Sequence, residues 1–177
     1  STDQLLKLLA VMDEDINMSI TKSGDKSISL KLTDSVSAVD YMLSDTSIIS
    51  KPPALKSLPE NFELKINMTP AVMGKFVKGK GALTDNFTII TDGDNTKMVI
   101  GHASINTNRI TIPVTTSEAS NIDNITFNAN IFKEVLSANS ECESATLEVS
   151  SAGLSKITFN VDDTSVTYYL VSVQDVD

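Results

Sequence analysis

The sequence predicts an α+β fold built from repeated units of one strand, one helix and three further strands. Three observations indicate this fold class. From Phe62 to Met68, apolar and polar residues alternate, which is the period of a strand with one buried face. Thr69 and Pro70 then begin a helix, since threonine caps helices and proline is tolerated at the first helical position. Finally, the same succession of elements returns elsewhere in the chain.

The helix after Pro70 is predicted to be one-sided, with an apolar face toward the core and lysines on the opposite face. Gly79 and Gly81 can supply the left-handed conformation that ends a helix, so Lys80 is expected in the exit loop. Pro113, in the last strand of this unit, predicts an edge strand or a strand end. The three strands after the helix are expected at Phe87–Ile90, Lys97–Ala103 and Arg109–Val114.

Two more units flank this one. In the first, an amphipathic helix at Thr2–Met12 precedes three strands, and no leading strand is found before it. The third follows a polar loop at Ser117–Asn124 and contains a helix at Ile131–Ala138. All three helices place two apolar residues, two spacers and two apolar residues, with a lysine among the spacers. The strands are expected at Ile16–Ile20, Ile28–Leu32 and Val36–Leu43 in the first unit, and at Ile125–Asn128, Ala145–Val149, Ile157–Val161 and Val166–Val173 in the third.

Composition narrows the function. The chain has 177 residues and a formal charge of −9, which argues against a general nucleic-acid coat but leaves room for a local basic surface. Cys142 and His102 are the single cysteine and histidine, so an internal disulfide is impossible, and we expect neither a zinc cluster nor a cysteine–histidine pair. We therefore expect a non-catalytic protein without a cofactor, in a reducing compartment such as the cytoplasm. The start at Ser1 is expected to reflect either a chain cut from a longer one or a chain that follows a removed tag.

The succession of units, a proline-containing connector between Leu43 and Phe62, and the ending at Val166–Leu170 before a short acidic tail carry a family resemblance. The chain resembles the DNA polymerase sliding clamps, particularly those of the T-even bacteriophage type. That resemblance implies a ring with antiparallel sheets outside and helices on its inner face. It also implies three parts: the second half of an amino-terminal domain at 1–43, an interdomain connector at 44–61, and a complete carboxyl-terminal domain at 62–177.

In such a ring the exposed helix faces meet duplex DNA. Lysines suit this role because they offer mobile charges to phosphates without reading bases. The alternative is that lysines on an exposed helix merely keep it soluble. Matching faces on three helices favour contact with DNA over this alternative. The residues expected to face DNA are Lys7, Lys75, Lys78, Lys80 and Lys133.

The resemblance implies two further surfaces. A hydrophobic pocket should receive short peptides of polymerase and clamp loader, although its connector residues could equally anchor the connector to the second domain. Edge strands at Val36–Leu43 and Asn108–Val114 should pair between neighbouring subunits. The expected pocket residues are Ile48, Ile49, Pro53, Leu55, Tyr169 and Val171, and the expected interface residues are Val36, Val39, Tyr41, Arg109, Ile110 and Ile112.

The leading hypothesis is a polymerase processivity factor that encircles duplex DNA, without sequence preference, as part of a homotrimeric ring. The alternative is a non-catalytic phage virion or tail module made of the same sheets, which would not bind DNA.

Overall fold

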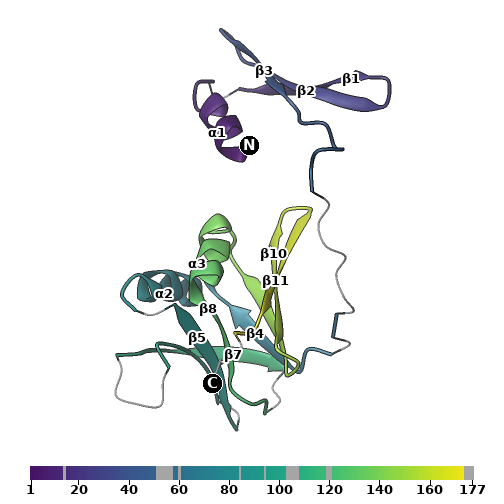
Figure 1. Ribbon diagram of the computed structural model, residues 1–177. Helices are drawn as coiled ribbons and strands as arrows, with labels where there is room; N and C mark the ends of the chain where they lie inside the picture. Colours follow the sequence, from purple (N-terminus) through teal and green to yellow (C-terminus); the bar gives the residue numbers. More distant parts are fainter. Residues whose placement is uncertain are drawn as a thin grey trace. The chain divides into compact units, whose positions relative to one another are not determined.

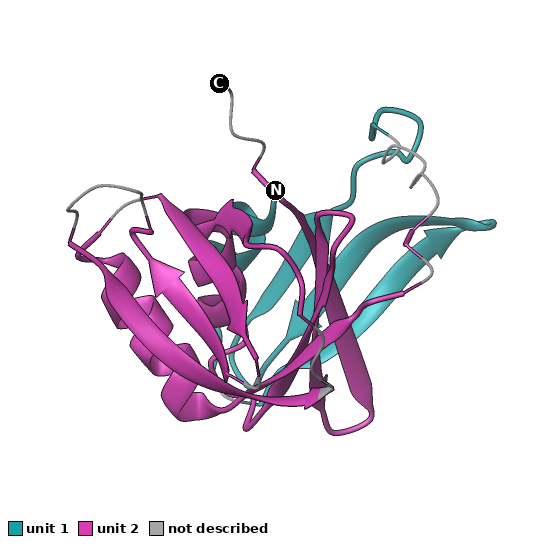
Figure 2. Ribbon diagram, turned by 90° about the horizontal axis from the view of Figure 1, so that it is seen from below, with its two compact units in different colours: residues 1–56 teal, residues 57–177 magenta. Residues whose placement is uncertain are grey.

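The computed structural model describes residues 1–13, 15–50, 58–59, 61–83, 85–93, 95–102, 108–118 and 121–173. These fall into two compact units, Ser1–Lys56 and Ser57–Asp177 (Figure 2). The division lies inside the segment expected to be a connector, 44–61. Each unit is described by itself.

Unit 1 is a helix and an antiparallel three-stranded sheet. Its elements are α1 (Thr2–Leu9), β1 (Asn17–Ser23), β2 (Lys26–Thr33) and β3 (Ala38–Met42), with the strands in the order β1-β2-β3 (Figure 1). The register places Ile20 opposite Leu30, and Leu30 opposite Tyr41. Because side chains alternate along a strand, these apolar residues share one face of the sheet.

The apolar face of unit 1 is thinly covered. Leu32 is fully buried, yet no residue of α1 is buried and every residue of β1 is exposed. Met18 and Ile20, on the apolar face, retain 61% and 56% of their exposure. Unit 1 therefore has the strand and helix pattern of the sequence without a closed core of its own.

Unit 2 contains two complete copies of the repeated β-α-β-β-β sequence of elements. The first runs from β4 through α2 to β7, and the second from β8 through α3 to β11. Its elements are β4 (Leu64–Met68), α2 (Pro70–Lys80), β5 (Asn86–Asp92), β6 (Asn95–Ile100), β7 (Ile110–Glu118), β8 (Ile125–Asn128), α3 (Ala129–Ala138), β9 (Ala145–Ser150), β10 (Leu154–Val161) and β11 (Thr164–Val171).

The two repeats exchange strands to form one antiparallel sheet, in the order β11-β10-β9-β4-β7-β6-β5-β8. The leading strand of each repeat pairs with the strand that follows the helix of the other: β4 pairs with β9, and β8 with β5. At the open ends, the Val173 amide donates to the Thr126 carbonyl and brings the end of β11 to β8. The α+β class and the repeated unit expected from the sequence are confirmed.

The core of unit 2 lies between the sheet and the neighbouring helices α2 and α3 (Figure 1). Phe76 of α2 packs edge-on against Phe132 of α3 and against Phe87 of β5, with both pairs of ring centroids 4.9 Å apart. Such edge-to-face pairs contribute about 1 kcal/mol each beyond the burial of their area. The aromatic cluster thus fixes α2 against α3 at the middle of both helices.

Several element boundaries differ from the sequence prediction. Lys80 is the last residue of α2 instead of an exit-loop residue, and Gly81 ends the helix with φ −60°, not in the left-handed region. The prediction that a left-handed residue ends this helix was wrong, because the chain continues in a further right-handed turn. Val36 precedes β3, and β7 continues to Glu118 where a loop was expected at Ser117. That extension exists because Thr115, Thr116 and Glu118 pair with β4.

Candidate nucleic-acid interface

The exposed face of α2 is basic. The Thr69 hydroxyl caps the helix by accepting from the Val72 amide at 3.4 Å, and Pro70 follows as predicted. Lys75 and Lys78 are exposed, while Met73 and Phe76 are buried on the opposite side. No aspartate or glutamate occurs in α2, and no described residue forms an ion pair with Lys75 or Lys78. The face therefore keeps two uncompensated positive charges.

The exposed face of α3 differs. Lys133 is half-buried, with 37% of its side chain exposed, and its amine lies 3.3 Å from the Glu134 carboxylate. Ile131, on the same helix, is 57% exposed. The expectation of three matching faces does not hold for α3, because Glu134 offsets the charge of Lys133. Lys7, on α1, is exposed.

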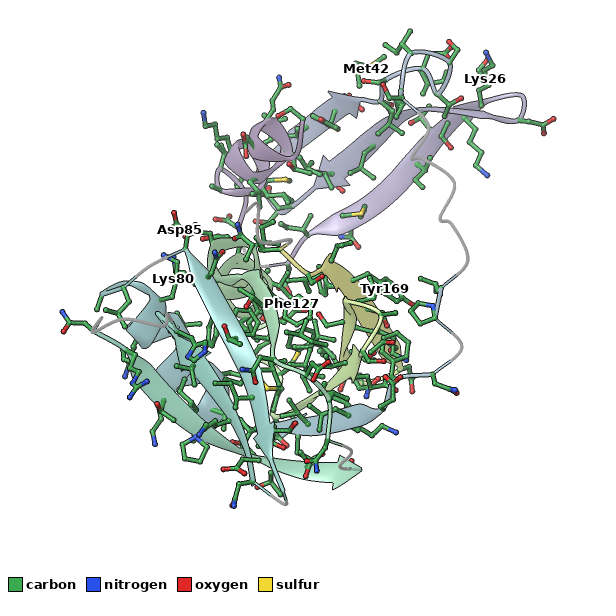
Figure 3. All side chains as sticks on the ribbon, turned by 60° about the horizontal axis from the view of Figure 1, so that its bottom comes forward. Lys26, Met42, Lys80, Asp85, Phe127 and Tyr169 are labelled. Carbon is green, nitrogen blue, oxygen red and sulfur yellow. The ribbon has the colours of Figure 1, made fainter. Side chains whose placement is uncertain are left out.

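Lys80 is buried, which separates it from the other lysines of this set. Its side chain is 10% exposed, and its amine lies 3.5 Å from a carboxylate oxygen of Asp85 (Figure 3). The amine also donates to the Leu83 carbonyl at 3.5 Å. The sequence interpretation assumed an exposed loop lysine, and the carboxylate that pairs with Lys80 lies beyond the helix, where no helical period could show it.

The residues expected to form the peptide pocket are divided between the units. Ile48 and Ile49 in unit 1 are 76% and 54% exposed, and Tyr169 and Val171 on β11 of unit 2 are 40% and 73% exposed. Pro53 and Leu55 lie outside the described residues. The grouping of these residues into one pocket stays a prediction.

Unit 1 holds a cavity of about 620 Å³ between the start of β2, the end of β3 and the segment that follows. Ile49 lines it, and Lys26 and Asp45 form an exposed ion pair of 3.5 Å at its rim. The apolar part of its lining comes from Ile28, Tyr41, Leu43 and Ile49.

The expected subunit interface has two free strand edges among the described residues. In unit 1, β3 pairs with β2 alone. In unit 2, Ile110–Val114 of β7 pair with β6 alone, since β4 pairs with the later part of β7, so the edge predicted from Pro113 exists over this half.

The side chains near these edges differ in exposure. Val36 is 82% exposed and Arg109 is exposed, whereas Val39, Tyr41 and Ile110 are half-buried. Ile112 is 2% exposed and belongs to the core of unit 2. The alternation of side chains along β7 turns Ile112 inward, so its side chain is not an exposed contact residue.

Two contacts at the start of unit 2 were missed by sequence reasoning. The Glu63 carboxylate accepts from the Ser151 amide at 3.0 Å and from the Ser151 hydroxyl at 2.8 Å. These hydrogen bonds lower the pKa of Glu63. The Lys156 amine lies 5.0 Å from the centre of the Phe62 ring. Both contacts hold residues 62–63 against the β9–β10 hairpin, and their partners lie 88 and 94 positions apart, beyond any local signal.

Among the described residues, no three metal-binding side chains gather in one place. None of the described helices has the length and apolar character needed to cross a membrane.

Of the comparisons with known proteins, only the one with solved structures found matches. No protein-family model matches the sequence, and no curated protein matches it. Among solved structures, the proliferating cellular nuclear antigen (PCNA) of Entamoeba histolytica matches with a TM-score of 0.73 and 16% identity, over 97% of this chain and 70% of that one. PCNA of Thermococcus kodakaraensis matches with a TM-score of 0.68 and 12% identity, over 96% and 70%.

The repeated β-α-β-β-β units define an α+β protein with antiparallel sheets and helices on one face. Within that class, the chain has the PCNA-like sliding-clamp fold.

Proposed function

We propose that this chain acts in a DNA polymerase sliding clamp of the T-even bacteriophage type, a non-catalytic ring that holds polymerase on duplex DNA. The observation that carries the proposal is the exposed face of α2, where no described carboxylate pairs with Lys75 or Lys78 in a chain of net charge −9. A duplex is attracted to such a face by its phosphates and repelled by the acidic remainder of the protein. Lys7, exposed on α1 of unit 1, is a further candidate for contact with the duplex, and Lys133 contributes less because Glu134 lies beside it.

The chemistry of the face favours sliding over sequence recognition. Lysine amines contact phosphates as mobile point charges, and α2 presents no asparagine, glutamine or arginine that could read base edges. Binding should therefore be independent of sequence and strongly dependent on salt.

The proposed domain organisation has residues 1–43 as the second half of an amino-terminal clamp domain, 44–61 as the connector and 62–177 as a complete domain. A comparison of equivalent strands supports it. Each of β1 and β9 follows the helix of its repeat, but β9 is paired on both edges and buries alternate residues, while β1 is paired on one edge and buries none. A further repeat beside β1 would give unit 1 the core that unit 2 has.

The proposed partners are DNA polymerase and the clamp loader, which would dock peptides on the apolar residues of the connector and β11, and further copies of the clamp in a homotrimeric ring. The docking of peptides is supported by the exposure of Ile48, Ile49, Tyr169 and Val171. Pairing with further copies of the clamp is supported by the free edges of β3 and β7.

The test is equilibrium binding to a short fluorescein-labelled duplex over a range of salt concentrations. Neutralising Lys75 and Lys78 together with glutamine should weaken binding, and the slope of log K against log salt should fall in magnitude by roughly 2. The matched control carries glutamine at Lys22 and Lys31, exposed lysines on the strands of unit 1, which removes the same charge elsewhere. Equal weakening by both pairs, or no binding by the unmodified chain, would contradict the proposal and favour a structural module.

A further inference from the structure

Lys80 is held by charged and polar partners at the end of α2. A buried lysine is costly unless its amine is paired, and here the amine meets the Leu83 carbonyl and the Asp85 carboxylate, each at 3.5 Å. The position also suits a cation, because the carbonyls at a helix carboxyl end carry partial negative charge. Lys80 therefore points back into the protein while Lys75 and Lys78 point out.

Asp85 continues the connection to α3. Its Oδ1 accepts from the Asn130 side-chain amide at 3.0 Å, and its main-chain carbonyl accepts from the Ala129 amide at 2.7 Å. The Asn130 hydrogen bond and then the charge of Lys80 hold the pKa of Asp85 below its ordinary value. The end of α2 and the start of α3 are thus joined through one carboxylate.

This joint complements the aromatic contact in the middle of the helices. Phe76 packs on Phe132 with ring centroids 4.9 Å apart, which fixes where α2 crosses α3. Lys80, four residues further along, adds a second, polar contact that joins the last turn of α2 to the start of α3. Lys78 lies between the two contacts and on the exposed side, so its direction depends on both.

We propose that Lys80 is a positioning residue, which acts through Asp85 and Asn130 to hold the basic face of α2 in the orientation that meets a duplex. It does not itself contact phosphate. This inference rests on the function proposed above, since it concerns the same face of α2.

The sign of the Asp85 effect separates this proposal from a direct contact. Removing a carboxylate near a DNA-binding face ordinarily strengthens binding, because it removes repulsion from the phosphates. If Asp85 holds Lys80, then Asp85→Asn should instead weaken binding to the labelled duplex by about fivefold, as Lys80→Met should. The double variant should be no weaker than either single variant, because both changes break the same joint.

The matched control is Glu134→Gln, which removes a carboxylate from the exposed side of α3 and should leave binding equal or stronger. An Asp85→Asn variant that strengthens binding as Glu134→Gln does would overturn the proposal. So would unchanged binding in both Lys80→Met and Asp85→Asn while the Lys75 and Lys78 variant is weakened.

A second readout needs no DNA. Residue-resolved hydrogen exchange on the full chain should show faster exchange at the amides of the last turn of α2 in both Lys80→Met and Asp85→Asn, with Glu134→Gln unchanged. Unaltered exchange would refute the joint whatever the binding result. If amide exchange in the last turn of α2 becomes faster but no lysine variant changes the affinity for the duplex, the function proposed above fails while the connection between the helices stands.

Discussion

The Lys156 amine lies 2.6 Å from a carboxylate oxygen of Glu148, its register partner on the neighbouring strand. Both side chains are largely covered, with 25% and 19% exposed, and the Phe62 ring lies 5.0 Å from the amine. The pair therefore sits in a less solvated position than an ordinary surface ion pair, where such contacts contribute little.

Removing one partner of this ion pair should destabilise the protein more than removing both partners. Lys156→Met leaves the Glu148 carboxylate partly buried without its partner, and we expect a loss of about 2 kcal/mol in the free energy of unfolding. The double variant with Lys156→Met and Glu148→Gln should recover part of that loss, with a coupling free energy of about 1 kcal/mol between the two sites. Urea denaturation of the unmodified chain, the two single variants and the double variant measures both quantities. Strictly additive losses would contradict the coupling.

Acid stability should depend on Asp34. Its carboxylate accepts from the Asp13 amide, the Val36 amide and the Ser37 hydroxyl, in that order of effect, which lowers the pKa from 3.8 to about 2. A carboxyl whose folded pKa is depressed stabilises the folded state above its unfolded pKa and loses that contribution as pH falls through the folded pKa. The contribution of Asp34 should thus disappear between about pH 4 and pH 2.

Carboxyl carbon chemical shifts should place the titration midpoint of Asp34 near 2. In Asp34→Asn, unfolding measured over the same pH range should lose the part of the acid dependence that Asp34 supplies. A midpoint at the ordinary value of 3.8 would show that these hydrogen bonds do not persist in solution.

Local sequence signals predicted the elements better than the contacts between them. Alternation from Phe62 to Met68 and the Thr69-Pro70 start were enough to predict β4 and the beginning of α2, because both depend on neighbours in the chain. The ion pair of Lys80 with Asp85, and the hydrogen bond from Asn130 to the same carboxylate, form only after folding. The exchange of strands between repeats likewise follows from tertiary pairing of β4 with β9, which no period within either strand encodes.

Two glycines in α2 offer a matched test of its packing. An added Cβ at Gly74 meets nothing within 4 Å, whereas at Gly79 it would lie 3.1 Å and 3.3 Å from the terminal methyls of Ile110 and Ile100. Gly74→Ala should stabilise the protein by roughly 0.5–1 kcal/mol through helix propensity alone. Gly79→Ala gains the same propensity but overpacks the core, and we expect a net loss of about 1 kcal/mol.

Thermal unfolding of both alanine variants gives the comparison. Gly74→Ala also leaves Lys75 and Lys78 on the same face, so its DNA affinity should equal that of the unmodified chain. Stabilisation of equal size at both positions would mean that Ile100 and Ile110 move aside without cost.

Self-association should depend on the free edge of β3, and the register shows where to block it. The Leu43 amide donates to the Ile28 carbonyl of β2, and amides alternate in direction along a strand, so the Val39 amide also points to β2 and the Asp40 amide points outward. A proline at position 40 therefore removes an outward donor and spares the pairing with β2, whereas one at position 39 damages the sheet itself. Asp40→Pro should lower the mass measured by sedimentation equilibrium while the circular dichroism spectrum is retained, and Asp40→Ala should leave both unchanged. An oligomer of unchanged mass in Asp40→Pro would rule out subunit pairing through this edge.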